Sequence, residues 1–205
     1  MTSRITFLSI FCFLIVNFLQ AAEPTPVRDY LDFSKQSAEW TWAHKDSIVD
    51  SWRENFDPEY VWGYFAPPKL IEMTRINAAL YNIEYDDKYA QRAKEILLNY
   101  RNFRDEYPEK AAVQRPDYEE GVPPLPDFFN LMLYIRAYEL LKDDGIFNKS
   151  EKKIIEGTVA ASLDYQMRIQ EWGPTNRAIL RAECFAWAVR AFPDHPKASK
   201  RSEEH

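Results

Sequence analysis

Apolar residues recur at three- and four-residue intervals along most of this chain, and this helical spacing is the feature that most constrains its fold. The spacing is found over residues 69–81, 89–103, 126–142, 151–168 and 176–192. The chain contains five glycines, and no stretch alternates apolar and polar residues between hairpin turns as a strand would. The sequence therefore predicts an all-α fold.

The five expected helices differ in how much of their circumference is apolar. Residues 89–103 and 151–168 each combine one apolar stripe with a charged face, which is typical of helices with a solvated side. Residues 126–142 and 176–192 are apolar nearly all round, which suits helices buried between neighbours. Residues 69–81 are intermediate in the apolar share of their circumference. Inner and outer helices thus alternate along the chain, and this alternation predicts stacked helical hairpins.

The expected connections alternate as well. Residues 54–68, 104–125 and 169–175 form longer segments that are rich in proline and aromatic residues, and each precedes an inner helix. We therefore expect these segments to gather at one end of the stack, beside the N-termini of the inner helices. Long ordered loops on a rigid scaffold are common places for binding sites.

The turn before residue 151 carries a helix-start signal. Asn148 and Glu151 are three residues apart, as in a capping box. Asn148 also begins an Asn-Lys-Ser sequence that fits an N-glycosylation site. Because a helical pattern starts there, the capping role is favoured over glycosylation.

The first 22 residues have the pattern of a secretory signal peptide. Arg4 precedes an apolar run, and small residues follow at Ala21 and Ala22. The run is shorter than the roughly 20 residues that span a bilayer. We therefore expect cleavage after Ala21 or Ala22, a domain over residues 23–205, and a periplasmic or secreted location with no membrane partner after cleavage. An uncleaved anchor is the alternative.

Charge and cysteine content narrow the possible partners. The net charge is −6, which argues against a nucleic-acid-binding protein that relies on phosphate contacts. Signal cleavage would remove Cys12 and leave Cys184 without an internal partner, so we expect Cys184 to be buried as a small hydrophobic residue. The three histidines are scattered and no cysteine or histidine spacing suits zinc, so neither a metal nor another cofactor is expected.

The stretch EWGPTNRAILRA, residues 171–182, opens the last expected helix with two cations. Arg177 and Arg181 stand in its first two turns, where the helix dipole disfavours positive charge. Asn176 adds an amide donor beside the free backbone N–H groups of the helix start, and Trp172 stands just before them as a ring for stacking or packing. Together these groups predict a receptor for a carboxylate.

An ordinary surface is the alternative for the same stretch. In that case Glu171 and Glu183 would pair with the two arginines. Two pairs of adjacent acids elsewhere, at residues 119–120 and 143–144, stand in polar turns and are more typical of solvated charges than of a glycosidase pair.

Four stretches resemble the heparinase II/III-like polysaccharide lyases, a group that includes alginate lyases. They are residues 63–70, 121–129, 171–178 and 192–196. The resemblance covers most of residues 62–196 and only the N-terminal helical part of that family. It implies an incomplete α/α toroid that is normally followed by a β-sheet domain, so residues 23–205 are expected to be a truncated part of such a lyase.

The resemblance also implies a chemistry. A uronate lyase removes the proton next to a carboxylate, and donors must neutralise that carboxylate as the enolate-like state forms. Asn176 matches an asparagine of the family, whereas Arg177 stands where many members have a histidine. The resemblance therefore places Asn176 and Arg177 at the catalytic centre and leaves the base unassigned. Residues expected to contact substrate are Arg181, Trp172, Tyr64 and Tyr165.

The expected function is thus that of a secreted lyase, or a fragment of one, which cleaves acidic polysaccharides such as alginate or glycosaminoglycans by β-elimination. This chain alone is expected to be almost inactive because it lacks an assigned base, and its last helix is expected to lack an outer partner. Ile179, Phe185, Val189 and Phe192 would then be uncovered. A non-catalytic glycan-binding remnant and a helical-toroid glycoside hydrolase are the alternatives.

Overall fold

The structure is a computed structural model that describes residues 25–54, 68–105, 125–167 and 176–195, and these residues contain helices and no strand. The all-α fold is thereby confirmed. The helices are α2 (Thr25–Ala43), α3 (Lys45–Glu54), α4 (Pro68–Glu84), α5 (Asp87–Asp105), α6 (Leu125–Leu141), α7 (Lys149–Met167) and α8 (Asn176–Ala191). The expected signal peptide lies outside the described residues.

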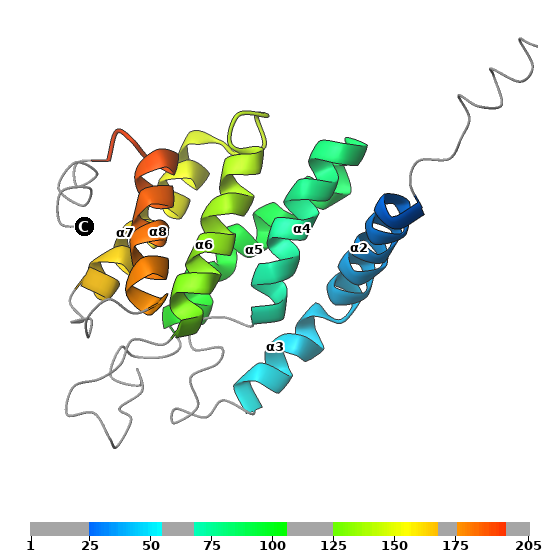
Figure 1. Cartoon of the computed structure of the whole chain (residues 1–205), viewed down its shortest axis with the longest axis horizontal. Helices are drawn as coiled ribbons and strands as arrows, with labels where there is room; N and C mark the ends of the chain where they lie inside the picture. Colours follow the sequence, from blue (N-terminus) through cyan, green and yellow to red (C-terminus); the bar gives the residue numbers. More distant parts are fainter. Residues whose placement is uncertain (1–24, 55–67, 106–124, 168–175, 196–205) are drawn as a thin grey trace, which may run out of the picture. The chain divides into compact units, whose positions relative to one another are not determined.

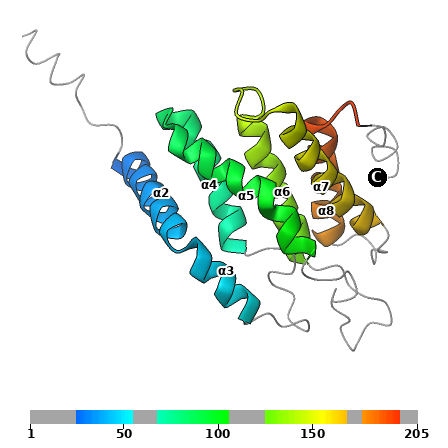
Figure 2. The same cartoon turned by 180° about the vertical axis from the view of Figure 1, so that it is seen from behind.

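Helices α4 to α8 form two layers (Figures 1 and 2). In the inner layer α6 packs between α4 and α8, and in the outer layer α5 packs against α7. Helix α5 also covers α4, and α7 contacts both α6 and α8. The alternation of inner and outer helices along the sequence is therefore present in the structure as stacked hairpins. Closure toward a toroid remains a prediction.

Residues 1–36 and 37–205 form two separate compact units. Of the first unit, the structure describes the N-terminal half of α2, in which Val27, Tyr30 and Phe33 are exposed. The second unit contains the remaining helices and the hydrophobic core.

The core lies between the two layers. Leu131, Ile135 and Leu141 of α6 are fully buried, as are Leu97 of α5 and Ile155 of α7. Cys184 of α8 is also fully buried, which confirms the expectation that it packs as a small hydrophobic residue. Burial of these side chains is the main stabilising contribution to the stack.

Helix α8 is covered more completely than its sequence suggested. Phe185 is buried, so the prediction that it lies on an uncovered surface was wrong. The physical reason is helical spacing: Phe185 shares a face with Ala188, which is also buried in the core. Ile179 lies on another face and is 68% exposed.

The capping box at the start of α7 is confirmed. The Asn148 side-chain oxygen accepts the backbone N–H groups of Ser150 at 2.9 Å and of Glu151 at 3.0 Å. In return, the Glu151 carboxylate accepts the backbone N–H of Asn148 at 2.8 Å. These reciprocal bonds satisfy N–H groups that the helix itself leaves unpaired.

Helices α2 and α3 were not predicted from the sequence. No residue of α3 is buried, and α2 exposes several large apolar side chains. Among the described residues, no helix is both long and apolar enough to cross a membrane.

Candidate functional site

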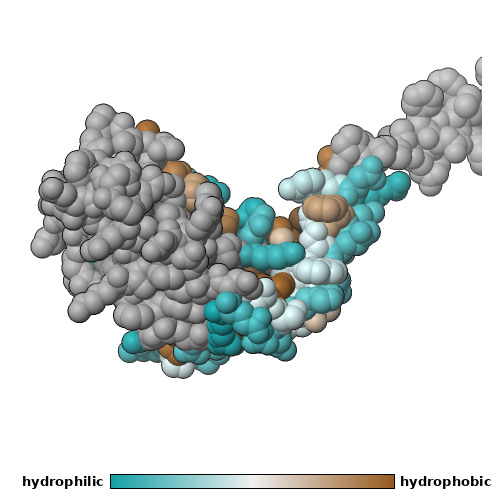
Figure 3. All heavy atoms as spheres, turned by 90° about the horizontal axis from the view of Figure 1, so that it is seen from below, coloured by the Kyte–Doolittle hydropathy of each residue, from teal (hydrophilic) through white to brown (hydrophobic). Residues whose placement is uncertain are grey.

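The three inner helices begin at the same end of the row (Figure 1). The positive ends of their helix dipoles therefore face one common region. In Figure 3, where the molecule is seen from below, the residues that carry colour are mostly hydrophilic, with hydrophobic side chains in smaller patches. An anionic ligand would be favoured in such a region.

The structure describes the predicted site residues to different extents. Asn176 and Arg177 are the first two residues of α8, and Tyr165 belongs to the last turn of α7, but the side chains of all three lie outside the described part. Trp172 and Tyr64 are outside the described residues altogether. Arg181 is thus the one predicted site residue whose side chain the structure describes.

Arg181 is half-buried in the second turn of α8. It stands one helical turn before Phe185 and shares its core-facing side. Glu183, by contrast, is exposed and engages other residues: its carboxylate lies 3.7 Å from the Arg136 guanidinium of α6 and accepts the Trp187 indole N–H at 3.3 Å. Glu183 is therefore engaged both with α6 and with Trp187 of its own helix.

Asn130 is a candidate that sequence reasoning missed. It is located in the second turn of α6, near the end where the inner helices begin, and is 3% exposed. Within the described ranges, its amide nitrogen has no hydrogen-bond partner. An unpaired buried donor costs about 1–3 kcal/mol, so such a group calls for an explanation, and contact with a bound ligand is one. The signal in the sequence is a single amide within the apolar stretch FFNLMLYI.

A cluster of charged and aromatic side chains joins the exposed faces of α6 and α8. The guanidinium carbons of Arg136 and Arg190 lie 4.7 Å and 4.9 Å from the centre of the Trp187 ring. Arg190 is also 3.3 Å from the Glu139 carboxylate. Cation–π contacts and ion pairs of this kind link neighbouring helices.

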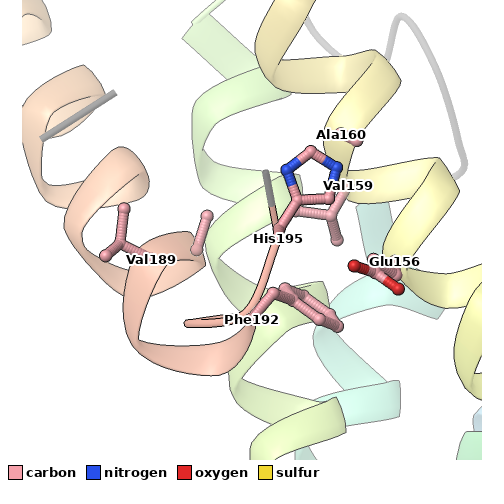
Figure 4. Close-up of a pocket in the computed structure, with 7 residues that line it drawn as sticks. Glu156, Val159, Ala160, Val189, Phe192 and His195 are labelled. Atoms are coloured by element: carbon pink, nitrogen blue, oxygen red, sulfur yellow. The ribbon is translucent and has the colours of Figure 1, made fainter. Parts of the chain in front are cut away.

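A small cavity lies between α7 and the turn that follows α8 (Figure 4). Glu156 and Val159 of α7 face Phe192 and His195 across it, and its volume is about 10 Å³. That volume holds about one water molecule and no sugar. The backbone N–H of His195 donates to the carbonyl of Phe192 at 3.2 Å, so His195 is part of a hydrogen-bonded turn.

His44 lies at the junction between α2 and α3. Its ring stacks on Trp40 with a centroid distance of 4.3 Å, and its Nδ1 atom lies 2.7 Å from the Trp40 carbonyl oxygen. These contacts fix the imidazole locally. Over the described ranges, no three histidine, cysteine, aspartate or glutamate side chains cluster so that they could hold a metal ion.

No family model, no curated protein and no solved structure matches this chain. The resemblance to polysaccharide lyases therefore stays a prediction that rests on the quoted sequence stretches.

Proposed function

We propose that this chain is a secreted polysaccharide lyase, or part of one, which acts on uronate-containing polysaccharides such as alginate or glycosaminoglycans. One arrangement carries the proposal: α8 begins at Asn176 at the same end of the row as α4 and α6. Arg181 and the unpaired amide of Asn130 stand in the second turns of the neighbouring helices α8 and α6. Donors and helix N-termini there favour a carboxylate.

The chemistry assigned to this end is β-elimination. A base takes the C5 proton of the uronate, the electron pair forms the C4–C5 double bond, and the 4-linked sugar leaves with a proton from an acid. Negative charge builds on the carboxylate during this step. Asn176 and Arg177 would stabilise that charge, while Arg181, Trp172, Tyr64 and Tyr165 would hold the sugar chain.

Binding provides the first test. Arg181→Ala should weaken oligouronate binding by about 10- to 100-fold, because it removes a charge-assisted hydrogen bond. Binding of neutral oligosaccharides should change little. Arg190→Ala is a matched control, because Arg190 lies on the same helix at its other end and its side chain is 70% exposed. An equal loss of uronate and neutral binding in Arg181→Ala would show a folding role instead.

Turnover provides the second test, with absorbance of the unsaturated uronate product on alginate and glycosaminoglycans as the readout. In a catalytically active form of the protein, Asn176→Ala should lower the turnover rate by about 10²–10³. The helix content, measured by circular dichroism, should not change. Robust turnover by this chain alone would require a base within it, to be sought among Tyr64, Tyr165 and His44. Binding without product supports a glycan-binding protein, and hydrolysis without a double bond supports a glycoside hydrolase.

A further inference from the structure

Helix α3, the C-terminal half of α5 and the first turn of α4 enclose a groove of about 460 Å³. This volume is within the roughly 300–1,000 Å³ that small-molecule sites occupy. Val49, Leu70 and Ile96 form its apolar part, and polar side chains of α3 and α5 form the rest. The groove is distinct from the start of α8, where the uronate site is proposed.

Most of the charges in the groove compensate one another. Lys45 of α3 forms an ion pair with Glu95 of α5, and the Arg53 guanidinium lies 3.7 Å from the Asp50 carboxylate. Within the described part of the chain, the Asp46 carboxylate has neither an ion pair nor a hydrogen bond, whereas the other charged lining residues pair with one another. The negative charge of Asp46 would repel a polymer that carries carboxylates, whereas it would not repel an uncharged ligand.

Two amides add hydrogen-bonding groups that the protein uses only in part. The Asn102 amide nitrogen donates to the Asn99 side-chain oxygen at 3.3 Å, and this is their one mutual bond. As far as the described residues are concerned, the Asn99 amide group retains both N–H donors and Asn102 retains its acceptor oxygen. Together with the Asp46 carboxylate, the groove offers donors and acceptors side by side.

We propose that this groove binds a neutral oligosaccharide. Sugar hydroxyls donate and accept hydrogen bonds at once, which matches Asp46 and the two amides. The C–H faces of sugar rings suit the apolar part formed by Val49, Leu70 and Ile96. Among the described lining residues, Asp46 alone carries an uncompensated charge, and its carboxylate can accept hydrogen bonds from sugar hydroxyls. The proposal does not depend on the uronate site.

The test is calorimetric titration of the full chain with neutral β-1,4-linked tetrasaccharides of glucose, mannose, xylose and N-acetylglucosamine. At least one should bind. Asp46→Ala should weaken that binding by about tenfold or more, and Asn99→Ala by about three- to tenfold, since hydrogen bonds to a charged group are the stronger ones. Both side chains are exposed, so neither change removes core packing.

Asp143→Asn is the matched control, because Asp143 is exposed in the turn after α6 and lines no part of the groove. Binding that survives this change and falls in both groove variants supports the proposal. Absence of binding by all four tetrasaccharides overturns it, and so does binding that Asp46→Ala and Asn99→Ala leave intact. Oligouronate binding is measured separately with Arg181→Ala, so each proposal can fail without the other.

Discussion

The Lys94 ammonium of α5 lies 2.8 Å from the Glu151 carboxylate of α7. Both side chains are largely buried, with 21% and 18% of their surface exposed. The same carboxylate accepts the backbone N–H of Asn148, and Lys94 also donates to the carbonyl of Ile146 at 2.9 Å. Glu151 therefore both caps α7 and forms an ion pair with the neighbouring outer helix. The same side chain takes part in a local helix cap and in a tertiary contact.

This contact makes stability depend on pH. The hydrogen bond from Lys94, with the backbone bond from Asn148, holds the pKa of Glu151 below 4.5. The ionised carboxylate therefore stabilises the fold above that pH, and the stabilisation is lost as pH falls through the lowered value. Glu151→Gln should lower the free energy of unfolding by about 1 kcal/mol at neutral pH, and the difference should shrink in acid. Urea unfolding measures both, with the exposed Glu72→Gln as the control.

The other half of the capping box gives a second prediction. Asn148→Ala should lower the free energy of unfolding by about 1 kcal/mol, because the N–H groups of Ser150 and Glu151 lose their acceptor. Asn148→Asp keeps an acceptor at the same place and should retain most of the stability. Thermal unfolding of the two variants compares them directly. A loss in Asn148→Asp as large as that in Asn148→Ala would show that the side-chain acceptor is not what stabilises the start of α7.

Tyr134 is fully buried, and its hydroxyl donates to the carbonyl of Leu97 at 2.8 Å. Burial raises the pKa of Tyr134 far above its ordinary value of 10.0. Tyr134→Phe should cost about 1 kcal/mol near neutral pH. Above about pH 10 the unfolded tyrosine loses its proton first, so this part of the wild-type stability is lost as pH rises. The gap between the two proteins in urea unfolding should therefore narrow in alkali, whereas Tyr30→Phe, at an exposed tyrosine, should show neither effect.

Tyr85 directly follows α4 and has a backbone φ of 55°, a left-handed conformation that is unfavourable for most residues other than glycine. Its N–H donates to the carbonyl of Tyr81 at 2.8 Å, as in a helix C-cap. Tyr85→Gly should stabilise the protein by up to about 1 kcal/mol, and Tyr85→Val should destabilise it. Thermal unfolding is the measurement, and Tyr85→Phe should be neutral. Destabilisation by glycine alone would assign the ring a packing role that its 80% exposure does not suggest.

Helices α4 to α8 were predictable because each buries apolar residues at helical spacing against a common core. Their observed bounds differ from the expected ones by a few residues. Helices α2 and α3 were not predicted, because they bury few large apolar residues. Val27, Tyr30 and Phe33 of α2 face solvent, and the apolar residues of α3 are only partly buried against the core.

The candidate sites were less predictable, because they depend on residues brought together from distant segments. The ion pair between Lys45 and Glu95 joins positions 50 apart in the sequence, and the groove beside it exists only once α3 packs near α5. Asn130 looks like one polar residue in an apolar helix until its burial and unpaired amide are known. Local patterns carry no information about either feature.

Helix α6 contacts α4, α5, α7 and α8, whereas α3 contacts α4 and pairs its Lys45 with Glu95 of α5. The hairpins therefore form a short one-dimensional array, in which each hairpin packs mainly against its neighbours and few contacts join distant hairpins. Folding can then advance by addition of one hairpin to its predecessor, without the slow closure of long loops. For the same reason, the free energy of local unfolding should rise from α3 toward α6. The centre of the row should therefore be the last part of the molecule to unfold.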